Sequence, residues 1–177
     1  MAHQERDFQA LAIAVLTVSD SRDAASDTSG DLLVARLQQA GHRLAAREIV
    51  RDDIYQLRRA VSAWIADDGV QVVLTTGGTG FSGRDSTPEA LTVLFDKQIQ
   101  GFGELFRQVS LAQIGPATIQ SRCVAGVANG TVIFCLPGSN NACATGWDEI
   151  IANQLDARTR PCNFVGLVSQ RFQESSQ

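Results

Sequence analysis

The sequence predicts a three-layer α/β/α sandwich built on a mostly parallel β-sheet with one antiparallel edge strand. Apolar runs typical of buried strands alternate along the chain with segments in which apolar residues recur at helical spacing. The dipeptide Asn129-Gly130 lies between two of these runs and is a strong β-hairpin signal. The alternation therefore predicts parallel strands joined by helices, and the hairpin predicts the antiparallel strand.

Five apolar runs are predicted to form the strands of this sheet. The first, residues 11–18, is almost continuously apolar, as expected for a strand that is buried on both faces. The other four predicted strands are residues 44–50, 70–74, 121–127 and 131–136. The run at 44–50 carries the weakest of these signals because charged residues interrupt it.

Helical periodicity predicts helices over residues 31–40, 53–67, 104–111 and 141–156, and residues 19–30 are predicted to be a loop. Asp53 is expected to cap the second helix, because Gln56 stands at the spacing of a capping box. A further helix is expected to begin at Pro88, with Thr87 as its N-cap.

The length of 177 residues is typical of one domain. We expect a single domain over residues 10–168, between flexible segments at 1–9 and 169–177. The sequence contains neither a signal-peptide pattern nor a long apolar span, so it predicts a soluble, cytoplasmic protein without a membrane partner.

Charge and metal-ligand content exclude two other classes of function. The net charge of -4 offers no basic surface for nucleic acid. The four cysteines form no C-x-x-C pair and the chain has only two histidines, so a Cys/His zinc site is not expected.

The strongest local signal is a glycine-rich segment, residues 74–89, that follows the predicted strand 70–74. Its four glycines permit positive φ and close approach of the backbone to a ligand. A glycine loop between a strand and a helix start favours the binding of a phosphate group.

Residues 78–83 match the dinucleotide pattern G-x-G-x-x-G, but their context argues against a dinucleotide site. The pattern follows the third predicted strand instead of the first, and the next predicted helix begins only at Pro88. The position twenty residues beyond Gly83 is Gly103, where an acidic residue is required. The chain also lacks the Gly-Lys-Ser or Gly-Lys-Thr of a Walker loop.

Three predicted loops each follow the carboxyl end of a predicted strand, so they meet at one edge of the sheet. In such folds, ligands bind at this edge. The loops are Ser19-Asp20-Ser21-Arg22, the glycine segment, and Pro137-Gly138-Ser139. This convergence predicts the position of a binding site.

The glycine segment contains Thr75-Thr76-Gly77-Gly78-Thr79-Gly80, followed by Arg84-Asp85 and Thr87-Pro88-Glu89. In these residues it resembles the molybdopterin adenylyltransferase family, which includes the G domain of gephyrin. Other matching segments are Thr17-Val18-Ser19-Asp20, Asp27-Thr28-Ser29-Gly30, Gly101-Phe102-Gly103-Glu104, Ser121-Arg122 and Leu136-Pro137-Gly138-Ser139. The resemblance covers about residues 10–164, and residues 154–164 are similar to the B branch of the family.

The resemblance implies transfer of an adenylyl group from Mg²⁺-ATP to the terminal phosphate of molybdopterin, with release of pyrophosphate. Asp52 and Asp85 are the implied catalytic residues and the implied ligands of Mg²⁺. The implied binding residues for nucleotide and substrate are Ser19, Asp20, Thr76, Gly77, Gly78, Thr79, Gly80, Arg84, Thr87, Ser121, Arg122, Pro137, Gly138 and Ser139. Other proteins of cofactor biosynthesis are implied partners.

Several of these residues also have a purely structural interpretation: Ser19 and Asp20 could only structure their loop, and Ser121 and Arg122 could only decorate the edge of a strand. Asp52 could cap the following helix, although Asp53 is the better candidate for that role. Asp85 could only orient its own loop, and Arg84 could be a solvated charge. Residues 137–139 could form no more than a turn, with Ser139 or Asn140 as a helix cap. A non-catalytic binding protein, or an oligomeric scaffold whose loops only pack, is therefore the alternative to an enzyme.

The resemblance implies a homotrimer, and its B branch implies a homohexamer made of two trimers. Two apolar segments, residues 99–106 and 164–168, are candidate subunit contacts. The alternative is that both segments fold back onto the core of their own chain.

Overall fold

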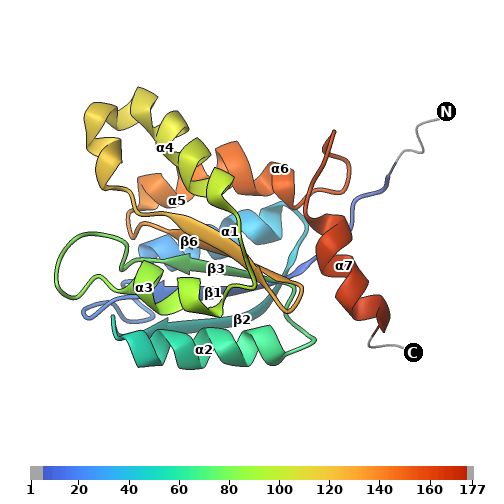
Figure 1. The fold of residues 1–177 in the computed structure, drawn as a ribbon, viewed down its shortest axis with the longest axis horizontal. Helices are drawn as coiled ribbons and strands as arrows, with labels where there is room; N and C mark the ends of the chain where they lie inside the picture. Colours follow the sequence, from blue (N-terminus) through green and yellow to red (C-terminus); the bar gives the residue numbers. More distant parts are fainter. Residues whose placement is uncertain (1–5, 175–177) are drawn as a thin grey trace.

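The computed structural model describes the backbone of residues 6–174 and the side chains of residues 6–170. Its strands are β1 (Ala12–Val18), β2 (Arg43–Val50), β3 (Val72–Thr76), β4 (Lys97–Gln98), β5 (Val124–Ala128) and β6 (Thr131–Leu136). They form one sheet in the order β2-β1-β3-β6-β5-β4, which runs through the middle of the molecule (Figure 1). β2, β1, β3 and β6 are parallel to one another, and β5 is antiparallel to both β6 and β4. The predicted fold class is therefore confirmed.

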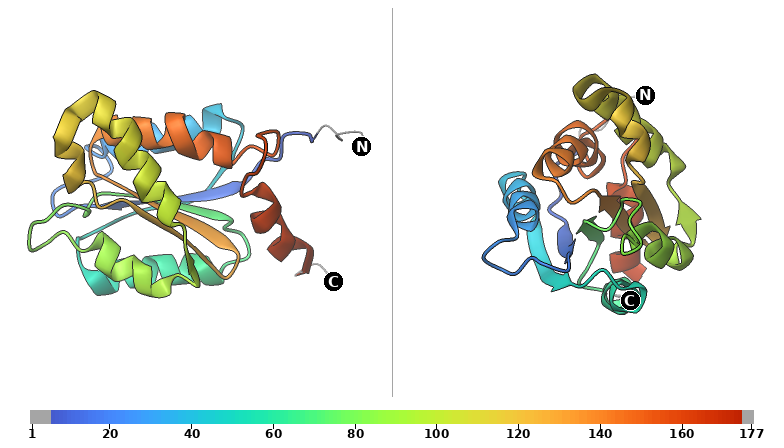
Figure 2. Two further views of the ribbon diagram at one scale, coloured as in Figure 1. Left: turned by 45° about the horizontal axis from the view of Figure 1, so that its top comes forward. Right: turned by 90° about the vertical axis from the view of Figure 1, so that its left-hand side faces the viewer.

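Helices cover both faces of this sheet (Figures 1 and 2). α1 (Thr28–Gln39), α4 (Gln100–Ile114), α5 (Asn140–Gly146) and α6 (Ala152–Gln154) lie on one face, and α2 (Ile54–Ala66) and α3 (Thr87–Leu91) lie on the other. A π-helical segment, η3 (Trp147–Ile151), joins α5 to α6 and completes the single long helix that the sequence predicted. Two 3-10 segments, η1 (Thr92–Leu94) and η2 (Gly115–Gln120), follow α3 and α4. α7 (Val165–Glu174) lies at one end of the sheet.

Successive residues of β1 face opposite sides of the sheet and divide the core in two. Ile13 and Val15 belong to a cluster with Phe102 and Phe106 of α4. Leu16 belongs to a second cluster, beneath α2 and α3. Every residue of β1 is buried, so the prediction of a strand covered on both faces is confirmed.

α1 begins three residues before its predicted start, because Asp27 caps it. The Asp27 carboxylate accepts a hydrogen bond from the Gly30 backbone N–H at 3.0 Å. It also accepts hydrogen bonds from the Thr17 hydroxyl at 2.7 Å and from Arg47 at 2.8 Å. Burial raises the pKa of Asp27, but the hydrogen bonds from Arg47, Thr17 and Gly30 outweigh burial and hold the pKa below its ordinary value.

Other boundaries differ from the predictions where tertiary packing overrides local sequence. β3 continues through Thr76 into the predicted loop, and β5 begins at Val124 instead of 121, because η2 runs to Gln120. α4 includes Gly103, where the sequence favoured a break. A Cβ atom at Gly103 would lie 2.5 Å from the Cys123 carbonyl oxygen, so this glycine allows α4 to approach the neighbouring chain closely.

Of the predicted N-caps of α2 and α3, the first is confirmed and the second differs by one residue. Asp53 caps α2, since its carboxylate accepts from the N–H groups of Tyr55 and Gln56 at 3.0 and 2.9 Å. At α3 the N-cap is Ser86, one residue before the predicted Thr87. Thr87 is helical, and its hydroxyl is used in a hydrogen bond to the Gly77 carbonyl.

Both segments proposed as subunit contacts fold mainly onto their own core. Phe102 and Phe106 are buried, as are Val165 and Val168 of α7. The alternative interpretation is therefore correct for these side chains. The segment expected to be a flexible C-terminal tail, residues 169–177, is instead helical as far as Glu174, as part of α7. Residues 1–5 and 175–177 of the expected flexible ends lie outside the described residues.

No helix between residues 6 and 174 combines the length and the apolar character needed to span a lipid bilayer.

Candidate functional site

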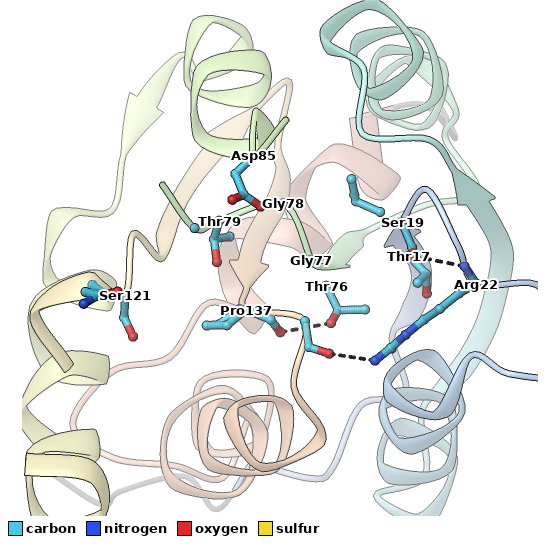
Figure 3. Close-up of a pocket in the computed structure, with 14 residues that line it drawn as sticks. Thr17, Ser19, Arg22, Thr76, Gly77, Gly78, Thr79, Asp85, Ser121 and Pro137 are labelled. Carbon is cyan, nitrogen blue, oxygen red and sulfur yellow. Dashed lines mark hydrogen bonds between the residues drawn. The ribbon is translucent and has the colours of Figure 1, made fainter. Parts of the chain in front are cut away.

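A cavity of about 400 Å³ opens where β1, β3 and β6 reach their carboxyl ends. The three loops predicted to converge all contribute to it (Figure 3). Its lining residues are Thr17, Val18, Ser19, Arg22, Thr76, Gly77, Gly78, Thr79, Gly80, Asp85, Gln120, Ser121, Pro137 and Gly138. The glycine loop, residues 77–86, projects from the end of the sheet opposite α7 (Figure 1).

Two glycines form the floor of the cavity and cannot be replaced without displacing their neighbours. Gly77 and Gly78 have φ values of 103° and 65°, in the left-handed region that favours glycine. A Cβ atom at Gly77 would overlap the Val18 carbonyl oxygen, and one at Gly78 would lie 2.6 Å from Oδ2 of Asp52. The loop is also tied to α3, because Thr87 N–H donates to the Gly78 carbonyl at 2.9 Å.

The backbone N–H groups of Gly78, Thr79 and Gly80 have no hydrogen-bond acceptor within the described part of the chain. All three residues line the cavity. Consecutive N–H groups that face a cavity are a typical cradle for phosphate oxygens.

The loop after β6 forms the opposite wall. The Thr76 hydroxyl donates to the Pro137 carbonyl at 3.0 Å, and the Gly77 N–H donates to Leu136 at 3.0 Å. Ser139 has turned away, since its hydroxyl accepts from the Ala142 N–H and caps α5. Ser139 is therefore the cap of α5, as the structural interpretation expected.

Two carboxylates stand on either side of the glycine floor. Asp85 lines the cavity, and its Oδ2 accepts a hydrogen bond from the Ser82 N–H at 2.8 Å. Asp52 lies behind Gly78, outside the lining, and its Oδ1 accepts from the N–H and the hydroxyl of Ser86. Burial raises the pKa of Asp52; the charges of Asp85 and Asp20 add to the increase, while the Ser86 hydrogen bonds oppose it.

These carboxylates could hold Mg²⁺. Oδ1 of Asp85 and Oδ2 of Asp52 accept no hydrogen bond from the described residues, so each carboxylate has one oxygen available. No group of three or more His, Cys, Asp or Glu side chains gathers as a metal site within the described residues. Two carboxylates suit Mg²⁺, which binds few protein ligands and keeps several waters.

Arg22 is a cavity residue that our sequence prediction missed. It approaches from the β1 loop, opposite Ser121 (Figure 3). Its guanidinium donates to the Ser29 hydroxyl at 2.5 Å and to the Gly138 carbonyl at 3.3 Å, and it lies 3.7 Å from the Asp27 carboxylate. The β1 loop was recognised in the sequence, but nothing local distinguished Arg22 from its neighbours.

Arg84 and Asp20 bind each other. Two nitrogens of Arg84 donate to the two carboxylate oxygens of Asp20, at 3.0 and 2.7 Å, and Asp52 N–H donates to the same carboxylate at 3.3 Å. The Arg84 hydrogen bonds lower the pKa of Asp20 below its ordinary value. This ion pair joins the β1 loop to the glycine loop, and neither residue lines the cavity.

The structure thus divides the predicted site residues into two groups. Those that line the cavity are Ser19, Thr76, Gly77, Gly78, Thr79, Gly80, Asp85, Ser121, Pro137 and Gly138. Those that lie behind or beside it are Asp20, Asp52, Arg84, Thr87, Arg122 and Ser139. Arg122 hydrogen-bonds to the glycine loop instead of entering the cavity.

Comparison with known proteins gives one family match, described as "Probable molybdopterin binding domain", over residues 14–157. Molybdenum cofactor biosynthesis protein B of Escherichia coli K12 is 55% identical over 164 residues, which cover 93% of this chain and 96% of that protein. The protein of the same name from Bacillus subtilis is 42% identical over 154 residues, which cover 86% of this chain and 91% of that protein.

A solved structure has the same fold. The crystal structure of a molybdenum cofactor biosynthesis protein B matches with a TM-score of 0.85 at 36% sequence identity. The match covers 95% of this chain and 99% of that one.

Proposed function

The chain belongs to the molybdopterin-binding domain family of molybdenum cofactor biosynthesis, and within that role we propose that it adenylylates molybdopterin. The reaction would join the terminal phosphate of molybdopterin to the α-phosphorus of ATP and release pyrophosphate. It requires no covalent intermediate with the protein. Its requirements are an oxygen nucleophile aligned with the phosphorus atom and neutralisation of the charge that develops on the leaving group.

The observation that carries the proposal is the row of unpaired N–H groups at Gly78, Thr79 and Gly80, with Asp85 beside it. These donors would hold phosphate oxygens, and Arg22 would add a positive charge on the far side of the cavity. The N–H groups and Arg22 lie on different loops around one cavity, so they could hold two phosphate groups in one orientation.

We propose that Asp85 and Asp52 hold Mg²⁺, which when bound would neutralise charge on the departing pyrophosphate. Asp85 would meet the ligand directly, since it lines the cavity. Asp52 would act from behind Gly78, through the one carboxylate oxygen that Ser86 does not use.

A second candidate function is non-catalytic binding of molybdopterin or a nucleotide. The observation that favours it is the position of Asp52, which lies outside the cavity lining and binds Ser86 with two hydrogen bonds. Holding the start of α3 could then be the whole role of this carboxylate.

Incubation of the purified protein with Mg²⁺-ATP and molybdopterin distinguishes the two candidates. We expect pyrophosphate release that depends on both substrates and that falls at least about 100-fold in Asp85→Asn, a size typical for loss of a group that stabilises charge. Binding of both ligands without pyrophosphate would reject catalysis and support the binding protein. Absence of binding would reject both and leave the scaffold.

We also propose that the chain assembles as a homotrimer or a homohexamer and that it passes its product to other proteins of cofactor biosynthesis. Support comes from Leu111 and Ile114 of α4 and Ile119 of η2, which are exposed although they are large and apolar. Exposed apolar side chains that gather in one region often mark a subunit contact. A soluble homo-oligomer usually closes by symmetry.

A further inference from the structure

Arg122 holds the glycine loop through several main-chain oxygens at once. Its Nε donates to the carbonyls of Thr79 and Gly80 at 3.2 and 2.9 Å. Its Nη2 donates to Gly80 at 2.5 Å and to the carbonyl of Asp85 at 3.2 Å. One guanidinium therefore connects the two ends of the segment from residue 79 to residue 85.

Two further side chains hold this guanidinium in place. Glu89, in the first turn of α3, forms an ion pair with Nη1 of Arg122. The Phe81 ring lies over the guanidinium, with 5.0 Å between the ring centre and Cζ, although 70% of Phe81 is exposed. Together, Arg122, Glu89 and Phe81 form what we call the Arg122 clamp.

Two other side-chain contacts hold the loop: Arg84 pairs with Asp20 of the β1 loop, and Ser86 binds Asp52. Gly83 has no heavy atom within 4 Å of the position that a Cβ atom would occupy, and residues 81–84 are exposed. Within the tip, Asp85 N–H donates to the Ser82 carbonyl, and Ser82 N–H donates to the Asp85 carboxylate. These contacts fix the shape of the turn. Arg84 and Ser86 tie the loop to the segments that follow β1 and β2, and the Arg122 clamp ties it to the segment that leads into β5.

We infer that Arg122 is a positioning residue, which places Asp85 and the phosphate-binding N–H groups through the loop backbone and does not contact the ligand. This inference rests on the function proposed above, and it assigns Glu89 and Phe81 as supports of the same clamp. Lysine cannot replace this arginine, because a single ammonium group cannot span the carbonyls of Thr79, Gly80 and Asp85 in the geometry of a planar fork.

The test compares Arg122→Gln and Arg122→Lys with a matched control, Arg36→Gln. Arg36 also forms an ion pair, through two nitrogens, but its partner, Asp148, lies on the surface away from the cavity lining. Hydrogen–deuterium exchange of residues 79–85 is measured together with thermal unfolding, kcat and KM for Mg²⁺-ATP.

We expect exchange of the Ser82 and Asp85 amides, which are the hydrogen-bonded N–H groups described in this segment, to rise roughly tenfold in both Arg122 variants, because the loop opens locally, and to stay unchanged in Arg36→Gln. We expect kcat to fall at least about tenfold while KM changes less than about threefold, since a displaced carboxylate mainly affects the reacting geometry. Phe81→Ala removes one support and retains Arg122, so its effect on exchange should be smaller and of the same sign.

The opposite pattern would overturn the inference. If Arg122 binds phosphate directly, Arg122→Gln raises KM, Arg122→Lys restores it, and loop exchange stays at the wild-type value. Failure of the proposed reaction gives a different result, because the wild-type protein would then release no pyrophosphate. The comparison of hydrogen–deuterium exchange would still test whether the Arg122 clamp holds the loop. If an Arg122 variant fails to fold, the exchange measured in Phe81→Ala makes the same test.

Discussion

Ser86 binds Asp52 twice: its backbone N–H donates to Oδ1 of Asp52 at 3.1 Å, and its hydroxyl donates to the same oxygen at 2.5 Å. The neighbouring Asp53 has a different task, because it caps α2. Asp53 therefore serves the stability of α2, and Asp52 is left for the catalytic role proposed above.

We predict that Asp52→Asn lowers the rate of pyrophosphate release at least about tenfold and leaves the melting temperature unchanged or higher. The amide oxygen of asparagine can still accept from Ser86. The substitution also removes a carboxylate whose pKa is raised by burial, and such a group destabilises the fold at pH values where it is ionised. Enzyme assays and thermal unfolding at pH 7 measure the two effects.

The matched variant is Asp53→Ala, which should lose about 1 kcal/mol of stability and keep the rate. If instead Asp52→Asn lowers the melting temperature and keeps the rate, Asp52 serves only to hold Ser86, and its catalytic assignment is wrong.

Gly78→Val should abolish binding of nucleotide and of pterin. The added side chain would strike Asp52 and Thr87, and a residue with a Cβ atom at a φ of 65° carries a strain of about 1–2 kcal/mol. Titration calorimetry measures the binding. Gly83→Ala is the control, because its Cβ atom would meet nothing within 4 Å, and undiminished binding in Gly78→Val would show that the loop is not the phosphate cradle.

We expect Arg22→Met to weaken Mg²⁺-ATP binding about tenfold or more, the typical loss for one charge-assisted hydrogen bond. Arg22 lines the cavity and already points its guanidinium at the Gly138 carbonyl. The dissociation constant is measured by calorimetry at fixed ionic strength, with Arg36→Met as a control for the loss of one charge. An equal dissociation constant in the wild type and Arg22→Met would remove Arg22 from the site.

Asp27→Asn is predicted to lower the free energy of unfolding by about 2 kcal/mol at pH 7. This is less than the ~3–5 kcal/mol expected for a fully buried ion pair, because Arg47 is partly exposed and retains its second ion pair, with Asp31. The pKa of Asp27 is depressed in the folded protein. Its stabilisation is therefore complete above the unfolded value near 3.8 and is lost as the pH falls through the folded value.

Denaturant titrations between pH 7 and pH 2 measure this dependence. The difference in unfolding free energy between the wild type and Asp27→Asn should be constant down to about pH 4 and shrink below it. A difference that shrinks between pH 7 and pH 5 would mean that another group is responsible.

Light scattering on the dilute protein should give three or six times the 19.0 kDa monomer mass. Ile119→Lys should reduce that mass, because Ile119 is 77% exposed on η2, which packs against α4, the helix that carries the exposed Leu111 and Ile114. Val93→Lys, an exposed apolar position on η1, is the control. A wild-type mass near 19.0 kDa would refute assembly, and a threefold mass would refute only the hexamer.

The sequence predicted those features whose causes are local. The cap at Asp53 was predicted because the N–H groups that it accepts from belong to Tyr55 and Gln56, two and three residues away. The early start of α1 was missed, because Asp27 is fixed partly by Thr17 and Arg47, which only the folded sheet brings near.

The same distinction applies to the site. The glycine loop was predicted because its conformation is a property of Gly77 and Gly78 themselves. Arg22 was missed because one of its acceptors, Gly138, lies 116 residues further along the chain. Arg122 was assigned to ligand binding because a sequence does not reveal which carbonyl groups a side chain will meet.

Residues 6–10 and α7 lie at the end of the sheet opposite the glycine loop, and the Ser169 hydroxyl donates to Gln9 there (Figure 1). A label, an affinity tag or a second protein fused at either end of the described chain would therefore extend away from the cavity mouth. Immobilisation through such a fusion would leave the mouth facing solvent, so ligands could be exchanged over a surface-bound sample. The geometry suits direct binding measurements on a sensor chip.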